Sequence, residues 1–160
     1  MSTSVRLRPP RHQLDRRSIA WWRTQIASVT VPIVLGASAL GMLSAWWYIL
    51  AAALLLGGVL IGVAMPLWWY RIHRWEVTDT AVYTRSGYFW QEWRVAPMSR
   101  IQTVDTVRGP LQQLFRLATV TVTTASAKGA VRIAGLDAEL AGRLAEELTE
   151  TTQATPGDAT

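Results

Sequence analysis

The fold of this chain is decided by residues 46–70, which read WWYILAAALLLGGVLIGVAMPLWWY and carry no charged side chain. A bilayer-spanning helix needs about 20 apolar residues, and Trp and Tyr prefer the two membrane interfaces. The segment between the two aromatic triplets is about 30 Å long as a helix, which matches the hydrocarbon core. We therefore predict one membrane span here, with these aromatic residues at its interfaces: Trp46, Trp47, Tyr48, Trp68, Trp69 and Tyr70.

A second apolar segment precedes this span, so that the uncharged run extends from Gln25 to Tyr70. This run is about twice as long as one span requires. We predict two transmembrane helices, at about residues 24–44 and 47–68, within a hairpin of residues 21–70. They are joined by a tight turn near Ser44, and Trp21 and Trp22 lie where the first helix enters the membrane.

Two alternatives to this hairpin are disfavoured. A buried helical hairpin in a soluble protein would need a polar helix face, and residues 49–67 have none. A secretory signal with a cleavage site at residues 37–39 (ASA) would be followed by mature protein, but here a second span follows at once.

The charges of the chain predict its topology. Of 16 basic and 11 acidic residues, six Arg and one Asp precede the hairpin, whereas residues 71–150 hold ten basic and nine acidic residues. The basic balance therefore belongs to the N-terminal arm, and nucleic-acid binding by the folded part has little support. Arg and Lys concentrate in cytoplasmic loops. Because arginines flank both ends of the hairpin, we predict a multi-pass protein of the cell membrane with both termini in the cytoplasm; these arginines are Arg16, Arg17, Arg23, Arg71 and Arg74.

Small residues recur at helical spacing inside the hairpin. Gly58 and Gly62 form one pair and Ala37 and Gly41 another, and such pairs let helix backbones approach closely. We predict that they pack the two helices together, and packing between subunits is the alternative. The spans hold no ionisable side chain, which argues against a transporter or pump.

After residue 71 the pattern changes to alternating apolar and polar residues, which predicts strands. We expect them at residues 75–77, 81–85, 88–95, 101–107, 118–123 and 131–133, with a two-residue turn at residues 86–87. A short helix covers residues 111–117, and an amphipathic helix begins at Asp137 with Leu140, Leu144 and Leu148 on one face. The prediction is one α+β domain of residues 71–153, an open barrel or sheet capped by the C-terminal helix. A disordered arm of residues 1–20 precedes the hairpin, and a disordered tail of residues 154–160 ends the chain.

Several motifs of this domain belong together: WEVTD (75–79), RSG (85–87), APMSRIQTV (96–104), GPLQQLFRLATV (109–120), TA (124–125) and IAGL (133–136). With them the chain resembles the bacterial pleckstrin-homology-like membrane proteins (PH domain 2 type), over about residues 8–147. The resemblance implies a short transmembrane hairpin joined to a PH-like domain. Its most specific element is P-x-x-R-I-Q at residues 97–102. The chain departs from the pattern at Gln113, where such proteins often have Arg, and at Arg116, where they often have Gly.

An enzyme is disfavoured. There is no Cys, the two histidines are His12 in the arm and His73 beside the membrane, and Asp79 and Asp105 show no paired spacing. Catalysis needs a nucleophile with a base, paired carboxylates or a metal site. We therefore predict no catalytic, cofactor-binding or metal-binding residue and no small-molecule substrate.

Two binding functions remain. A protein-interaction or scaffold module, with a partner protein or a second copy, is favoured because an anchored domain with exposed sheet edges suits it. A module for anionic lipid headgroups is the alternative. It is less favoured because such modules use clustered Lys and Arg, whereas the basic residues of this domain are scattered among acids. The candidate interaction residues are Arg94, Arg100, Gln102 and Arg108. Arg100 lies in a corner after Pro97, where binding a partner and satisfying nearby carbonyls are equally supported.

Overall fold

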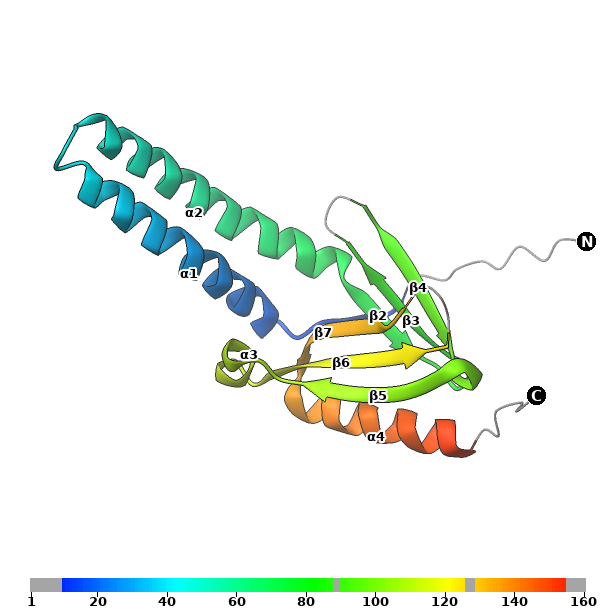
Figure 1. Cartoon of the computed structure of the whole chain (residues 1–160). Coiled ribbons are helices and arrows are strands. Elements are labelled where there is room, and N and C mark those ends of the chain that lie inside the picture. Colours follow the sequence, from blue (N-terminus) through cyan, green and yellow to red (C-terminus); the bar gives the residue numbers. More distant parts are fainter. Residues whose placement is uncertain (1–9, 88–89, 126–128, 155–160) are drawn as a thin grey trace, which may run out of the picture. The chain divides into compact units, whose positions relative to one another are not determined.

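The computed structural model describes residues 10–87, 90–125 and 129–154, and the chain divides into two compact units (Figure 1). One unit is the helical hairpin of residues 16–70, and the other combines the residues before it with residues 71–160. The prediction of a disordered arm through residue 20 is wrong for its described part. Residues His12–Gln13 form a strand, β1, and the first helix begins at Arg17. Residues 1–9 and 155–160 lie outside the described residues.

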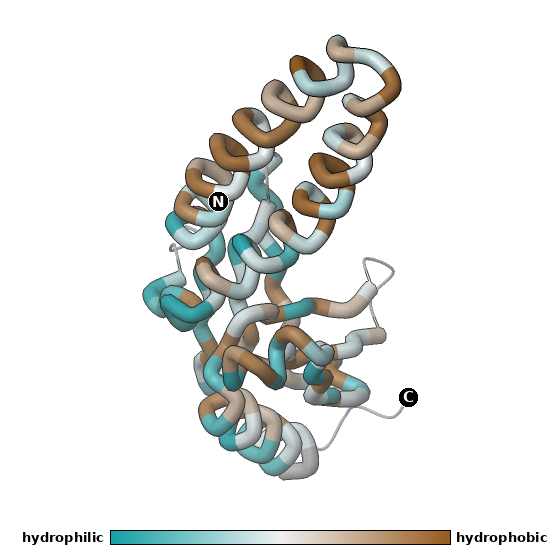
Figure 2. The backbone as a smooth tube through the Cα atoms, turned by 90° about the vertical axis from the view of Figure 1, so that its left-hand side faces the viewer, coloured by the Kyte–Doolittle hydropathy of each residue, from teal (hydrophilic) through white to brown (hydrophobic). Residues whose placement is uncertain are grey.

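The hairpin consists of α1 (Arg17–Leu40) and α2 (Trp46–Ile72), both long and apolar enough to cross a membrane. Large apolar side chains such as Leu35 and Leu56 remain exposed along it, and Figure 2 shows hydrophobic residues along both helices. Exposing apolar surface to water costs about 25 cal/mol per Å². Because so many apolar side chains of the hairpin are exposed, it suits a lipid environment. The first helix begins and ends earlier than the predicted residues 24–44. It begins at Arg17 and includes Arg23, because Arg is a good helix former, and it ends at Leu40, before the turn at Gly41.

The second unit contains two antiparallel sheets (Figure 1). One sheet has the order β1-β2-β3-β4, with β2 (Arg74–Val77), β3 (Ala81–Ser86) and β4 (Glu92–Pro97). The other has the order β5-β6-β7, with β5 (Ile101–Val107), β6 (Leu117–Thr124) and β7 (Val131–Asp137). A 3₁₀ turn, η1 (Met98–Arg100), connects the sheets, α3 (Pro110–Leu114) precedes β6, and α4 (Ala138–Ala154) ends the domain. Among the described strands no ladder joins the two sheets, so the barrel is not closed; the PH-like sheet with a C-terminal helix is confirmed.

The core contains residues of α4 and of both sheets, among them the buried Val82 of β3 and Ala96 of β4. Alternate residues of β6 are fully buried, among them Val120 and Val122, and α4 packs against β5 and β6 with Leu144 and Leu148. Leu140, also predicted on the apolar stripe, is only half-buried. Asp137 caps the helix, because its Oδ1 accepts hydrogen bonds from the backbone N–H groups of residues 139 and 140 at 3.0 and 3.3 Å.

The connection between β3 and β4 is longer than predicted. Ser86 pairs with Glu92, so residues 87–91 form the connection and β4 begins at residue 92 rather than 88. Gly87 has φ 140°, a conformation that favours glycine. Arg85 contacts the last residue of this connection and a residue of β4, since its Nη2 donates to Gln91 Oε1 at 2.7 Å and its guanidinium lies 5.3 Å from the ring centroid of Trp93. Tyr88, the predicted first strand residue, lies outside the described residues.

The segment before the hairpin is attached to both sheets of this unit. β1 pairs with β2, and Gln13 O accepts a hydrogen bond from Trp75 Nε1 at 3.3 Å. Asp15 N donates to the carbonyl of Gly135 at 3.1 Å. Gly135 is the extra residue of a bulge between β6 and β7 and has φ 86°. A bulged residue leaves the ladder, so its carbonyl is available to the arm.

Candidate functional site

The four predicted interaction residues do not form one site. Arg94 lies on β4 in the first sheet, whereas Arg100 ends η1 and Gln102 lies at the start of β5 in the second. Arg108 follows the other end of β5. At the rise of a strand, Gln102 and Arg108 are about 20 Å apart. The structure therefore offers separate candidate surfaces.

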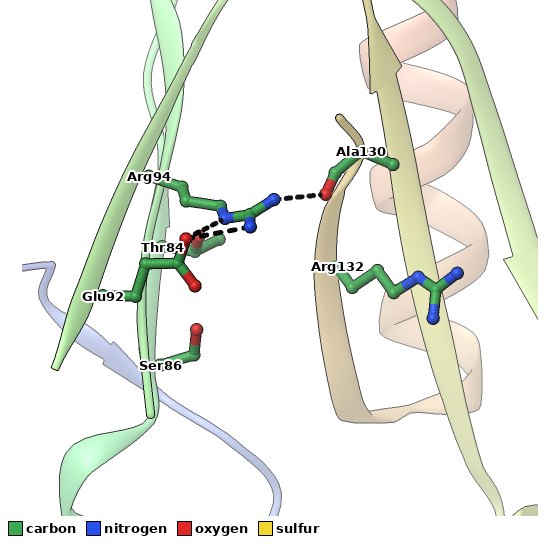
Figure 3. A pocket seen from close by; sticks show the side chains of 6 residues that line it. All are labelled: Thr84, Ser86, Glu92, Arg94, Ala130 and Arg132. Carbon is green, nitrogen blue, oxygen red and sulfur yellow. Dashed lines mark hydrogen bonds and ion pairs between the residues drawn. The ribbon is translucent and has the colours of Figure 1, made fainter. Parts of the chain in front are cut away.

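Arg94 bridges the facing edges of the two sheets (Figure 3). Its Nη1 donates to the carbonyl of Ala130 at 2.9 Å, while its Nε and Nη2 contact Glu92 Oε1 at 2.9 and 2.8 Å. The carboxylate offsets the guanidinium charge, because charge-assisted pairs of this length are strong hydrogen bonds. Arg94 thus has a structural role in holding β4 near the turn before β7.

A pocket of about 370 Å³ adjoins this pair, lined by Thr84, Ser86, Glu92, Arg94, Ala130 and Arg132. In Figure 3 the side chain of Arg132 points away from the Arg94–Glu92 pair. The pocket therefore presents two hydroxyls and a carboxylate, with one arginine already paired and the other at its rim. This arrangement can hold a small polar group but concentrates little positive charge.

The outer edge of β5 forms a second candidate surface, which we call the β5 edge. Among the described strands β5 pairs only with β6. Its residues are exposed on both faces; these are Gln102, Thr103, Asp105, Thr106 and Val107. Gln102 is the extra residue of a bulge, because Ile101 pairs with Thr124 and Thr103 with Thr123. Proteins commonly protect such edges with Lys, Pro or a bulge; residues 101–107 contain neither Lys nor Pro, and the bulge is confined to the start of the strand.

Arg100 precedes this edge and is exposed, as is Ser99. The carbonyl of Arg100 accepts a hydrogen bond from the N–H of Ala125 at 3.1 Å, which holds the corner to the end of β6. Sequence reasoning found Arg100 and Gln102 but not the rest of the edge. The weak alternation of residues 101–107 was the available signal, since a strand buried on one face alternates clearly.

A third candidate surface is the corner formed by the end of β5 and α3. Arg108 Nε donates to the carbonyl of Leu117 at 3.3 Å. The buried Gln112 anchors α3, because its Oε1 accepts from Gly109 N at 3.0 Å and its Nε2 donates to Thr119 Oγ1 at 2.8 Å. Sequence reasoning missed Gln112, whose burial no local pattern marks. Arg116 has φ 54°, which explains why the resembling proteins often have glycine there.

The aromatic residues lie at the two ends of the helical hairpin. At one end the Trp22 and Trp69 rings meet edge to face at 5.6 Å, and Trp21 lies 6.0 Å from Trp22. At the other end Trp46 and Trp47 lie 4.1 Å apart. Tyr48 and Trp68 are exposed and Tyr70 is half-buried. Placement at the membrane interfaces stays a prediction.

The small residues of the hairpin occupy distinct places. A Cβ added to Gly58 would collide with Thr30 of α1, whereas one added to Gly62 would lie 3.8 Å from Ile26 Cγ2. Ala37 is buried, and a Cβ on Gly41 would lie 2.5 Å from the ring of Tyr48. Gly58 and Gly62 therefore line the contact between α1 and α2. Packing between subunits through these residues stays a prediction.

In the part of the chain that the structure describes, no three His, Cys, Asp or Glu side chains gather as metal ligands would. His12 lies against Trp75, with their rings 5.1 Å apart. Its position is explained by packing of β1 on β2.

Two antiparallel sheets closed by a C-terminal helix, joined to two helices of membrane length, define a membrane-anchored PH-like protein. Residues 24–152 match the family model described as Bacterial PH domain, and the chain belongs to this family. It is similar to the UPF0699 transmembrane protein YdbS of Bacillus subtilis (strain 168), with 31% identity over 156 residues that cover 93% of this chain and 97% of the relative. No solved structure matches the chain.

Proposed function

We propose that this protein is a non-enzymatic, multi-pass adaptor of the cell membrane whose PH-like domain binds an extended segment of a partner protein on the β5 edge. The observation that carries the proposal is this exposed edge strand, which pairs on one side only among the described strands. An edge strand presents unpaired N–H and C=O groups, and an extended peptide can add to it as a further strand.

The charges beside the β5 edge indicate a basic partner segment. α4 packs against β5, and its exposed charged residues are Glu139, Arg143, Glu146, Glu147 and Glu150. Asp105 lies on the strand itself, and the exposed Arg100 and Arg108 lie at its two ends, so that five acids stand against three arginines. A surface with this excess of acids attracts a basic segment and disfavours an acidic one.

We further propose that the domain and both termini lie on the cytoplasmic side. The support is the distribution of arginine, which flanks the start of α1 and the end of α2 but is absent from the turn at residues 41–45. A binding edge in the cytoplasm would meet soluble and membrane-bound partners alike.

The alternative function is binding of an anionic lipid headgroup in the pocket beside Arg94. Thr84, Ser86 and Arg132 support it with two hydroxyls and a positive charge. It ranks second because the Arg94 guanidinium is engaged by Glu92 and Ala130. A phosphate would have to displace the carboxylate and would leave it unpaired close by.

A photo-crosslinker tests the proposal. A benzophenone amino acid replaces Thr106, on the β5 edge, in the full chain in its native membrane, and the matched control replaces Thr80, an exposed turn residue of the first sheet. We expect adducts to a basic segment of another protein from position 106 and none from position 80. Adducts to a second copy of this chain would show that the β5 edge binds another subunit rather than a different protein. Adducts to lipid alone contradict the proposal.

A binding measurement follows on the mapped segment. A synthetic peptide of that segment is titrated against the full chain in nanodiscs by fluorescence anisotropy. Lys on an edge opposes strand addition and repels a basic peptide, so Thr106→Lys should weaken binding at least about tenfold, the effect of 1.4 kcal/mol. Thr80→Lys should leave it unchanged. Equal affinities for both variants would refute binding at this edge.

A further inference from the structure

The corner between β5 and α3 exposes apolar and basic side chains together. Leu114 is 73% exposed and Val107 is 57% exposed, and Arg108 and Arg116 are exposed beside them. Residues 107–117 include two arginines and no acid. We call this surface the α3 corner. Apolar side chains flanked by arginine are the composition that binds the interface of an anionic membrane.

The α3 corner lies close to the point where the chain leaves this unit for the hairpin. Asp15 is the last residue before the hairpin unit, and its N–H donates to the carbonyl of Gly135. Two residues further along β7, Asp137 pairs with Leu117 of β6, and the carbonyl of Arg116 accepts from Ala138 N at 3.0 Å. At strand spacings, Arg116 is therefore within about 15 Å of Asp15. The α3 corner is therefore near the residue through which this unit is tethered to the hairpin.

Arg116 follows the C-cap of α3 and holds a backbone conformation that arginine rarely adopts. Its φ of 54° is disfavoured for any residue with a Cβ. The side chain is exposed, so packing inside the domain does not offset this cost. Strain held at an exposed residue is typical of functional positions. The nearest acids along the chain are Asp105 and Asp137, and Asp137 caps α4 through Oδ1.

We propose that the α3 corner docks on the surface of an anionic bilayer. Leu114 and Val107 enter the interface, and Arg108 and Arg116 contact lipid phosphates. This second attachment orients the tethered PH-like domain on the membrane. The α3 corner shares Val107 with the β5 edge, whereas Arg108, Leu114 and Arg116 lie outside that strand.

The test uses the full chain, which contains no cysteine and so permits labelling at one introduced site. Leu114→Cys carries an environment-sensitive fluorophore. The control is Glu150→Cys with the same label, a position roughly 18 Å from the start of α4. Each protein is reconstituted into vesicles of phosphatidylcholine, alone or mixed equally with phosphatidylglycerol, that contain a lipid-attached quencher. We expect strong quenching at position 114 in the mixed vesicles, weaker quenching in the neutral ones, and little at position 150 in either.

Two further variants separate charge from folding. Arg116→Gly suits the backbone conformation and removes the charge, so the docked-to-free ratio in mixed vesicles should fall about fivefold, as expected for one juxtamembrane cation. Arg116→Lys should retain docking. Equal quenching at positions 114 and 150, quenching indifferent to phosphatidylglycerol, or docking unchanged in Arg116→Gly would each overturn the proposal.

Discussion

The backbone N–H of Asp15 donates a hydrogen bond to the carbonyl of Gly135 at 3.1 Å, and so ties the segment that leads into α1 to the last strand of the PH-like domain. The bond exists because Gly135 is a bulge residue whose carbonyl has left the ladder. The domain is therefore built from two pieces of chain that the hairpin separates. A fragment that begins at residue 71 therefore lacks one of these two pieces.

A fragment of residues 71–153 should be less stable than the complete domain. It lacks β1, so Trp75 Nε1 loses its acceptor Gln13 O. A hydrogen bond whose donor is released to water contributes about 0.5–1.5 kcal/mol. Thermal melting of this fragment is compared with that of a second one, in which residues 10–15 are joined to residues 71–153 by a flexible Gly-Ser linker. Equal melting temperatures would show that β1 contributes nothing to stability.

Gly58→Ala should destabilise the helical hairpin, because the added Cβ would collide with Thr30. Overpacking of this kind typically costs about 1–3 kcal/mol. Gly57→Ala is the matched control, since nothing lies within 4 Å of its added Cβ and Ala favours helix. Unfolding by sodium dodecyl sulfate in mixed micelles measures the difference. If Gly57→Ala loses as much stability as Gly58→Ala, the helices do not pack at this glycine.

Gln112→Ala should loosen α3. The substitution removes the buried amide that bonds Gly109 N and Thr119 Oγ1, at a cost of about 1–3 kcal/mol for the groups left unsatisfied. The neighbouring Gln113→Ala is the control, because that exposed side chain makes one long bond, 3.3 Å to Arg108 O. Hydrogen exchange of residues 109–117 should rise in the first variant and remain near wild type in the second. Similar exchange in both would exclude an anchoring role for Gln112.

The predicted topology can be tested with reporters. Alkaline phosphatase, which is active only outside the cytoplasm, is fused after Thr160 and, separately, inserted in the turn at residues 41–45. Arginine at both inner ends of the hairpin predicts an inactive C-terminal fusion and an active turn insertion. Green fluorescent protein after Thr160 should fluoresce. The reverse pattern would place the PH-like domain outside the cell and would contradict its proposed location.

The candidate surfaces were only partly predictable. Arg100 and Gln102 lie at the β5 edge, as a corner and strand assigned from Pro97 and Ile101 suggested. Arg94 was named for its charge, but its contacts with Glu92 and Ala130 come from residues on both sheets. Charge is visible in a sequence, whereas the partner that offsets it is visible only after folding.

The sequence by itself determined the two apolar helices, the strand and helix periodicity of the domain, and the cap at Asp137. These features depend on hydropathy and on contacts within a few residues. Only the tertiary structure decided that His12 pairs with Trp75, that Ser86 pairs with Glu92, and that no ladder joins the two sheets among the strands described. Such pairings join residues across turns or across the whole hairpin, and their free energy depends on packing against other elements, which no local pattern specifies.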